Sequence, residues 1–238
     1  MVPDLILDKK YNNVGVKLSG GADSAIVYYG VCEYYRNTDT NIYVLTMDTT
    51  LKGWYSRGAA HLIDIVENLT GVSPVDHFIW DEPNHINSST SNYYSSGIND
   101  MENRAVNIYD LDAIYSGLTI NPPVDEMRRY FIENSPRWNL DLSTVMSHIN
   151  GRDTSRDTTE ERPFFTKRYS ETKTVDRIRP FIDKDKRAVA AAYEYYNVTE
   201  TLYPHTYSCE NVEASKTFTP CCHCFFCLER YYGFGRMV

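Results

Sequence analysis

The sequence predicts an α/β fold in which a parallel sheet carries helices on both faces and a small carboxy-terminal module follows. Three observations predict this fold. Strand-like and helix-like segments alternate over the first two thirds of the chain. The composition, with 42% hydrophobic and 24% charged residues among 238, is that of a globular protein large enough to bury a core. Five of the six cysteines lie between Cys209 and Cys227. We therefore expect a main domain over residues 1–200 and a module over residues 201–238 packed on it.

The first elements form a series of strand, helix, strand and helix. An apolar strand over 14–18 leads through a glycine turn into a helix over 24–35. A buried strand over 42–47 and a helix over 57–69 follow, and Gly71 ends that helix. The later elements that we expect are three strands and then one helix with an apolar stripe, over 75–80, 111–115, 177–181 and 185–196.

Two segments lack the periodicity of a helix or a strand. Residues 81–97 are rich in Asn, Ser and Tyr, and this composition predicts a loop that covers a site. Residues 151–176 carry balanced basic and acidic side chains. A solvated surface insertion is the first interpretation of this segment, and a mobile lid whose arginines meet phosphates is the second.

The charge balance excludes one large class of function. With 24 basic and 32 acidic residues the net charge is −8, which argues against a protein that mainly grips nucleic acid. The first residues lack the apolar run of a secretory signal, and no later run approaches the roughly 18 apolar residues of a membrane helix. We expect a soluble, cytoplasmic chain without a membrane partner.

The glycine turn after the first strand predicts an anion site. It consists of Ser19, Gly20, Gly21, Ala22, Asp23 and Ser24. Two adjacent glycines let a ligand approach bare backbone amides. The helix that starts near Ser24 adds unpaired N–H groups and its positive dipole end, and the serine hydroxyls add further donors. Asp23 either caps the helix or holds a Mg²⁺ ion that bridges phosphate oxygens.

The clustered cysteines predict a structural metal site. Two Cys-x2-Cys turns and one distant cysteine supply four thiolates for one tetrahedral ion. We assign Zn²⁺ to Cys209, Cys221, Cys224 and Cys227. Cys222 and His223 are alternate ligands, and an iron–sulfur cluster or disulfides are the alternative uses of these cysteines. A shell filled with sulfur makes the metal structural and leaves it no open position to activate water.

The turn between strand and helix resembles the SGGxDS pyrophosphate loop of the N-type ATP pyrophosphatases. Asp48, at the end of the second strand, is also where that family places an acidic residue. The resemblance implies that ATP, with Mg²⁺, is cleaved between its α and β phosphates. An acceptor oxygen becomes an adenylate, pyrophosphate stays on the loop, and adenine lies near residues 46–50.

The carboxy-terminal residues make the resemblance more specific, because they are similar to one family of such enzymes. The run Cys221-x2-Cys224-x2-Cys227-x2-Arg230-x2-Gly233-Phe234 follows Thr206-Tyr207-Ser208-Cys209 and is similar to the ending of the 7-cyano-7-deazaguanine synthase family. That family joins such a zinc site to an SGGxDS loop on an adenine nucleotide alpha hydrolase-like, Rossmann-like fold. The resemblance also implies that Lys186 stabilises charge near the phosphates and that Arg230 reaches the nucleotide. The alternative for each of these two residues is a surface side chain.

The family resemblance implies a specific reaction. An ATP-dependent carbon–nitrogen ligase of this kind adenylates a carboxylate on a 7-deazapurine and uses ammonia to form the nitrile, with release of AMP and pyrophosphate. It works in queuosine biosynthesis on small molecules, without nucleic acid, and the family often forms homodimers.

The sequence departs from the family between the two motifs. Similarity is clear over residues 14–48 and 177–236. The family's own residues are replaced at 48–54, 102–104 and 117–123. The part of the site that binds the acceptor therefore differs from that of the family. A second interpretation is therefore an adenylating enzyme with another acceptor: a small acid, a tRNA base or a protein amine. The third is a non-catalytic scaffold whose zinc module binds a partner.

Overall fold

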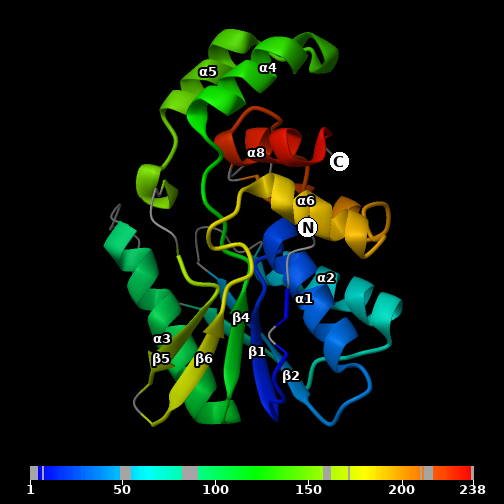
Figure 1. Cartoon of the computed structure of the whole chain (residues 1–238), viewed down its shortest axis with the longest axis vertical. Coiled ribbons are helices and arrows are strands. Elements are labelled where there is room, and N and C mark those ends of the chain that lie inside the picture. Colours follow the sequence, from blue (N-terminus) through cyan, green and yellow to red (C-terminus); the bar gives the residue numbers. More distant parts are fainter. Residues whose placement is uncertain are drawn as a thin grey trace.

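A six-stranded sheet forms the centre of the computed structural model (Figure 1). Its strand order is β3-β2-β1-β4-β6-β5, and all neighbouring strands are parallel except β5, which runs antiparallel to β6. The strands are β1 (Asn13–Lys17), β2 (Asn41–Asp48), β3 (Asp76–Asp81), β4 (Ala113–Ser116), β5 (Phe165–Tyr169) and β6 (Thr174–Ile178). The structure describes residues 5–6, 8–48, 55–81, 91–157, 162–170, 172–209, 211 and 217–236.

Helices cover both faces of the sheet, as the sequence predicts. On one face, which we call the α1 face, α1 (Ala22–Tyr35), α2 (Tyr55–Thr70) and α6 (Lys186–Tyr195) share the larger hydrophobic core with the central strands. On the opposite face, the α3 face, α3 (Ser91–Tyr109) packs on a second apolar cluster that centres on β2. The result is a Rossmann-like architecture in which each face carries its own core.

Three further helices lie beyond the carboxyl edge of the sheet. They are α4 (Val124–Trp138), α5 (Leu142–Asn150) and α8 (Phe225–Phe234). Figure 1 shows α8 between α6 and the α4–α5 pair, and α8 contacts all three of these helices. Two short 3₁₀ turns, η1 (Thr154–Arg156) and η2 (Tyr203–His205), complete the described elements.

Strand β1 shows how the sequence assigns side chains to the two faces. Successive side chains of a strand point to opposite faces. Val14 and Val16 enter the core of the α1 face, where both are fully buried. Gly15 faces the other side, and a Cβ there would lie 2.8 Å from the Leu111 side chain. Lys17 therefore also lies on the α3 face, where its amine pairs with Glu102 of α3.

Seven of the eight predicted strands and helices are confirmed. Strands predicted over 14–18, 42–47 and 75–80 correspond to β1, β2 and β3, and helices predicted over 24–35 and 57–69 correspond to α1 and α2. The strand predicted over 111–115 is β4, and the helix predicted over 185–196 is α6. Boundaries differ by two residues or fewer for all of these elements.

The structure corrects the remaining predictions. Residues 91–97, predicted as part of a loop, belong to α3, while residues 82–90 lie outside the described part of the chain. The last strand is β6, three residues earlier than predicted. The hairpin partner β5 and the helices α4 and α5 were not predicted. Only a narrow stripe or one face of each of these elements is buried, so most of its residues are charged or polar. The apolar periodicity in the sequence is therefore weak.

Within the described residues, no helix combines the length and the apolar character that crossing a membrane requires.

Candidate active site

The glycine turn lies at the point of the sheet where ligands of such folds bind. The strand order reverses between β1 and β4, and in open α/β sheets a crevice opens outside the carboxyl ends of the strands at this switch point. The turn after β1 leads directly into α1, and the turn after β4 begins with Gly117. A Cβ at Gly117 would lie 2.4 Å from the backbone carbonyl atoms of Asp23, so the two turns are in main-chain contact.

The conformation of the turn leaves the first amides of α1 open. Gly20 has a φ of +86°, a left-handed conformation that favours glycine. Gly21 is the amino-terminal cap of α1, and no side chain caps the helix. The Ser24 hydroxyl instead donates to the Gly21 carbonyl at 3.0 Å and accepts from the Ser19 amide at 3.2 Å. The helix start therefore combines uncapped donors with a positive dipole end, which is the physical basis of an anion site.

Asp23 points away from the backbone amides and toward a lysine. Its Oδ2 forms an ion pair with Lys186 at the start of α6 and accepts from the Thr119 hydroxyl at 3.4 Å. Its Oδ1 is buried and has no hydrogen-bond partner. Asp23 is thus not the helix cap, and of its two predicted roles only the second matches this geometry. A buried carboxylate oxygen without a donor suits a hard cation such as Mg²⁺.

Lys186 is a buried residue of the site. Its side chain is only 5% exposed, and the main chain of Gly233 in α8 packs against it. The surface interpretation of Lys186 is therefore wrong. A buried ammonium is stable when a carboxylate pairs with it, and Asp23 supplies that carboxylate.

Arg230 is also buried, and it lacks a carboxylate partner among the described residues. Its Nη1 donates to the carbonyl and hydroxyl of Thr206 at 3.1 and 2.9 Å, and its guanidinium lies 4.4 Å from the centre of the Tyr203 ring. Its Nε and Nη2 are buried without a hydrogen-bond partner. Burying a cation in this way is unfavourable unless an anion compensates it. The alternative of a surface arginine is wrong.

The segment that carries Arg230's partners also touches the glycine turn. The Tyr207 amide donates to the Gly20 carbonyl at 2.8 Å. A Cβ at Gly21 would lie 3.4 Å from the Ser208 hydroxyl oxygen, and that hydroxyl is 3.4 Å from Arg230 Nη1. The carboxy-terminal residues therefore form one wall of the anion site.

Two functional candidates were missed by sequence reasoning. Arg156 of η1 donates to Thr119 Oγ1 at 3.1 Å and forms a bidentate pair with Glu229, at 2.5 and 3.1 Å. Although burial acts in the opposite direction, the Glu229 carboxylate raises the pKa of Arg156. Glu229 is fully buried, so this pair connects α8 to Thr119 and thereby to Asp23. No sequence spacing links Arg156 to Glu229, but Thr119 lies just after a predicted strand, where site residues concentrate.

These contacts correct both interpretations of residues 151–176. Arg156 and Arg168 are not solvated side chains of an insertion, because they bind the fully buried carboxylates of Glu229 and Glu102. For the same reason these two arginines are engaged within the protein and do not form a free lid.

Asp48 lies at the carboxyl end of β2 and is buried. It accepts hydrogen bonds from the amide and the hydroxyl of Ser56, and so it fixes the first turn of α2. Close by, the Thr46 hydroxyl donates to the Leu18 carbonyl and is bonded to His77, both at 2.8 Å. Of the residues predicted to line an adenine site, Thr49 and Thr50 lie outside the described residues.

A cavity of about 490 Å³ lies beside the glycine turn, and Gly58 lines it. Gly58 packs against the turn, since a Cβ added at Gly20 would lie 3.3 Å from the Gly58 Cα. Its volume is typical of small-molecule sites, which span roughly 300–1,000 Å³. It is lined mainly by the first turns of α2 and by the segment around η2, with Arg57, His61, His205, Tyr207 and Phe218 among its residues.

The four cysteines predicted as metal ligands come together. The sulfur atoms of Cys209, Cys221, Cys224 and Cys227 all lie within 4.8 Å of one another. The Cys221–Cys227 and Cys209–Cys224 sulfur pairs are 4.0 and 3.9 Å apart. A tetrahedral ion with metal–sulfur bonds of about 2.3 Å separates its sulfurs by about 3.8 Å. The cluster therefore fits a single metal ion. In a [4Fe-4S] cluster each thiolate binds a different iron atom, so the sulfurs lie further apart.

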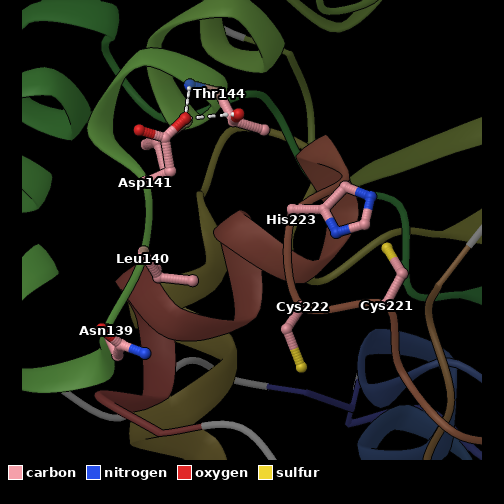
Figure 2. Close-up of a pocket in the computed structure, with 8 residues that line it drawn as sticks. Asn139, Leu140, Asp141, Thr144, Cys221, Cys222 and His223 are labelled. Carbon is pink, nitrogen blue, oxygen red and sulfur yellow. Dashed lines mark hydrogen bonds between the residues drawn. The ribbon is translucent and has the colours of Figure 1, made fainter.

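The alternate ligands point elsewhere. Figure 2 shows the thiols of Cys221 and Cys222 pointing in opposite directions from neighbouring positions. Cys222 has a φ of +66°, its sulfur is 3.4 Å from the Pro220 carbonyl, and it packs beside the α4–α5 cluster. The His223 ring packs near His148 of α5, with 5.6 Å between ring centres. Neither residue joins the four-cysteine group.

No family model and no curated protein matches the sequence. Among solved structures, the chain is similar to the U34-tRNA thiolase NcsA from Methanococcus maripaludis, determined with its [4Fe-4S] cluster. The TM-score is 0.48 with 16% sequence identity, and the match covers 88% of this chain and 66% of that one. The chain thus spans about two thirds of the length of that thiolase. At this level of similarity, its activity and its cluster are properties of that protein alone.

Proposed function

We propose that the chain is an adenylating enzyme of the ATP pyrophosphatase type. The observation that carries the proposal is the turn from Ser19 to Ser24, with its left-handed Gly20 and an uncapped helix start at the switch point of the sheet. Asp23 lies in this turn with its Oδ1 buried, and Lys186 and Arg230 are buried cations beside it. Together these features supply what a leaving pyrophosphate needs: backbone donors, a positive helix end and two cations.

Each residue then has a distinct task. The amides from Gly20 to Ser24 and the Ser19 hydroxyl hold the β and γ phosphates. Lys186 and Arg230 stabilise the negative charge that develops on the bridging oxygen when the α–β bond breaks. The chain needs no covalent nucleophile, because orienting the acceptor oxygen against the α-phosphorus and stabilising charge account for the catalysis.

Asp23 is the residue that fits Mg²⁺, through its unpartnered Oδ1. The ion would neutralise phosphate charge during the transfer. We assign the nucleoside of ATP to the cavity beside Gly58, since the Thr46 hydroxyl is already engaged with Leu18 and His77. Asp48 supports this region indirectly, because it fixes the start of α2.

We further propose that Zn²⁺ is the ion held by Cys209, Cys221, Cys224 and Cys227. The all-sulfur donor set and the sulfur spacing favour it. The metal has a structural role, since it fixes the start of α8 and with it Arg230 and Glu229.

For the acceptor we propose a carboxylate on a 7-deazapurine, as in 7-cyano-7-deazaguanine synthases. The carboxylate oxygen attacks the α-phosphorus and pyrophosphate leaves. Ammonia then displaces AMP and loses a proton, which gives the amide. Adenylation of the amide oxygen by a second ATP, followed by loss of AMP and the remaining amide protons, yields the nitrile. The resemblance to that family at both ends of the chain supports this acceptor. Because segment 117–123 differs from the family, other acceptors should be tested alongside the 7-deazapurine.

The deciding experiment incubates zinc-loaded protein with ATP, Mg²⁺, ammonia and 7-carboxy-7-deazaguanine. AMP, pyrophosphate and the nitrile mass are measured together. Nitrile formation supports the full proposal. ATP binding without nitrile supports the second function, an adenylating enzyme for another acceptor, and the acceptor is then sought by pyrophosphate release. If the metallated protein does not bind ATP, the proposal fails and the scaffold interpretation replaces it.

A further inference from the structure

Two donors meet the same oxygen of the Asp23 carboxylate and leave the other oxygen free. Lys186 forms an ion pair with Oδ2, and the Thr119 hydroxyl donates to Oδ2 at 3.4 Å. Oδ1 is buried and has no hydrogen-bond partner among the described residues. Because both donors lie on the Oδ2 side, they fix the carboxylate with the lone pairs of Oδ1 available to a cation.

Arg156 sets the direction of the Thr119 hydroxyl. Its Nη2 donates to Thr119 Oγ1 at 3.1 Å, so this oxygen already accepts a hydrogen bond. A hydroxyl has one proton of its own to donate, and Asp23 Oδ2 is the acceptor within its reach. Thr119 is only 3% exposed, which limits competition from water for that proton. Arg156 therefore directs the hydroxyl proton toward Asp23.

Arg156 also holds the main chain that carries Thr119. Its Nε donates to the Thr119 carbonyl and its Nη2 to the Ile120 carbonyl, both at 3.3 Å. In the other direction, the Asn121 amide donates to the Arg156 carbonyl at 3.2 Å. Side-chain and main-chain hydrogen bonds thus join η1 to the turn after β4.

Glu229 keeps the Arg156 guanidinium in this orientation. Both carboxylate oxygens accept from Arg156, at 2.5 and 3.1 Å, and the Glu229 side chain is fully buried. A bidentate pair fixes the plane of a guanidinium as well as its position. Glu229 lies in α8 only two positions after Cys227, so the four-cysteine group is joined to the same pair.

From these contacts we infer that Thr119 and Arg156 are positioning residues of the proposed Mg²⁺ site. Arg156 orients the Thr119 hydroxyl, and this hydroxyl holds Asp23 so that Oδ1 faces the ion. The inference rests on the proposed function, because it concerns how the residue that fits Mg²⁺ is held there. Both residues act through Asp23 and not by contact with the nucleotide.

The test measures how much Mg²⁺ tightens the binding of α,β-methylene-ATP to the full zinc-loaded chain. Calorimetric titrations with and without Mg²⁺ give two dissociation constants, and we call their ratio the Mg²⁺ factor. The buffer contains no chelator, so that zinc stays bound. A residue that acts on the ion site changes the Mg²⁺ factor, whereas a general loss of structure weakens binding equally in both titrations.

Thr119→Val removes the hydroxyl but keeps the shape of the side chain. It should lower the Mg²⁺ factor by about tenfold, as expected for one hydrogen bond to a charged group, with little change in binding without Mg²⁺. Thr119→Ser retains a hydroxyl and should keep most of the factor. Thr70→Val is the matched control, because Thr70 is 5% exposed and its hydroxyl donates within α2. Its Mg²⁺ factor should equal that of the wild type.

Arg156 is tested together with Glu229, because a single substitution would leave a buried carboxylate without its arginine. The double variant Arg156→Gln/Glu229→Gln should lower the Mg²⁺ factor as much as Thr119→Val does. Adding Thr119→Val to the double variant should then change little more, since Arg156 acts through that hydroxyl. Melting temperatures are measured for every variant. If the double variant does not fold, Arg156→Lys, which keeps the charge but not the fork, replaces it and should also lower the factor.

The combined variant also tests the alternative, a direct action of the Arg156 charge on Asp23. Burial lowers the pKa of Arg156, while Glu229 and then Asp23 raise it, so the two charges do interact. A direct action predicts that the effects of the substitutions add, and additive effects would overturn the role of Arg156 as a residue that acts through Thr119. An unchanged Mg²⁺ factor in the folded Arg156 variant would overturn it as well.

An unchanged Mg²⁺ factor in folded Thr119→Val would overturn the whole inference. An equal loss in Thr119→Ser or in Thr70→Val would do the same, because the loss would not then depend on the hydroxyl at Asp23. A wild type that binds the analogue equally with and without Mg²⁺ would refute the ion site at Asp23, and with it the inference, while ATP binding stands. Failure of the wild type to bind the analogue at all refutes the proposed function, and the inference falls with it.

Discussion

The two faces of the sheet's carboxyl edge present cations and donors in opposite ways. On the α1 face, the consecutive residues from Gly20 to Ser24 offer backbone amides, and the glycines let the chain itself contact a ligand. On the α3 face, the side chains of Lys17, Arg168 and Arg177 from three separate strands pair with Glu102. The first arrangement is encoded by a short sequence motif, and the second forms only when the strands of the sheet come together. The difference teaches that an array of backbone donors can be encoded locally, while a cluster of charged side chains is assembled from residues far apart in the sequence.

Removal of the metal should have the largest effect, and that effect should fall on the α1 face. The cysteine cluster fixes the segment that contacts Gly20 and carries Arg230, so the α1 face depends on it. We expect chelation, or Cys227→Ser, to lower the melting temperature by about 10 °C, as a loss of roughly 3 kcal/mol does in a domain of this size. Calorimetry below the melting temperature should show that binding of an ATP analogue is lost. Unchanged ATP affinity in metal-free protein would show that the metal module does not support the turn.

Asp23→Asn tests the chemistry of the α1 face alone. The substitution keeps the shape of the side chain but removes the charge that pairs with Lys186 and fits Mg²⁺. We expect pyrophosphate release to fall on the order of 100-fold with the fold retained. Asp183→Asn, at a carboxylate that pairs with its neighbour Lys184, is the control and should retain full activity. Full activity in Asp23→Asn would remove Asp23 from the mechanism.

Gly117→Ala tests whether main-chain contact between the turns after β1 and β4 matters. The new Cβ would lie 2.4 Å from Asp23 backbone atoms and 2.6 Å from the Ser24 amide nitrogen, and backbone atoms cannot move aside easily. We expect a loss of about 2–3 kcal/mol in the free energy of unfolding, measured in urea, with weaker ATP binding. Gly151→Ala, where the nearest atom is 3.3 Å away, should change stability much less. Equal effects of both substitutions would argue against a close approach at Gly117.

The smallest expected effect is on the pH dependence of stability, which depends on Lys17 of the α3 face. Burial, together with the positive charges of Arg177, Arg168 and Arg179, lowers the pKa of Lys17 to about 7, while Glu102 is the carboxylate that faces it. Between pH 7 and the ordinary lysine pKa of about 10.4, the unfolded chain holds a proton that the folded chain has lost. The stability of the wild type should therefore rise with pH over this window, relative to Lys17→Met. Parallel curves for the two proteins would mean that Lys17 keeps its proton.

The sequence was sufficient for the features that depend on neighbours along the chain. The first three strands, the glycine turn and the cysteine ligands each follow from spacing or composition within a few residues. The pairs Arg156–Glu229 and Lys17–Glu102 join residues 73 and 85 positions apart, and no local rule predicts such partners. Helix α3 was missed at its start because residues 91–97 carry polar side chains, and β5 because its hairpin partner, more than its own sequence, places it in the sheet.

The hydrogen bond from Tyr207 to Gly20 has a consequence for biosynthesis. Domains fold progressively from the amino terminus as the chain emerges from the ribosome. The turn from Ser19 to Ser24 emerges well before Tyr207, from which it receives one of its walls. A nascent chain can therefore assemble its sheet before the turn receives the wall that contains Tyr207.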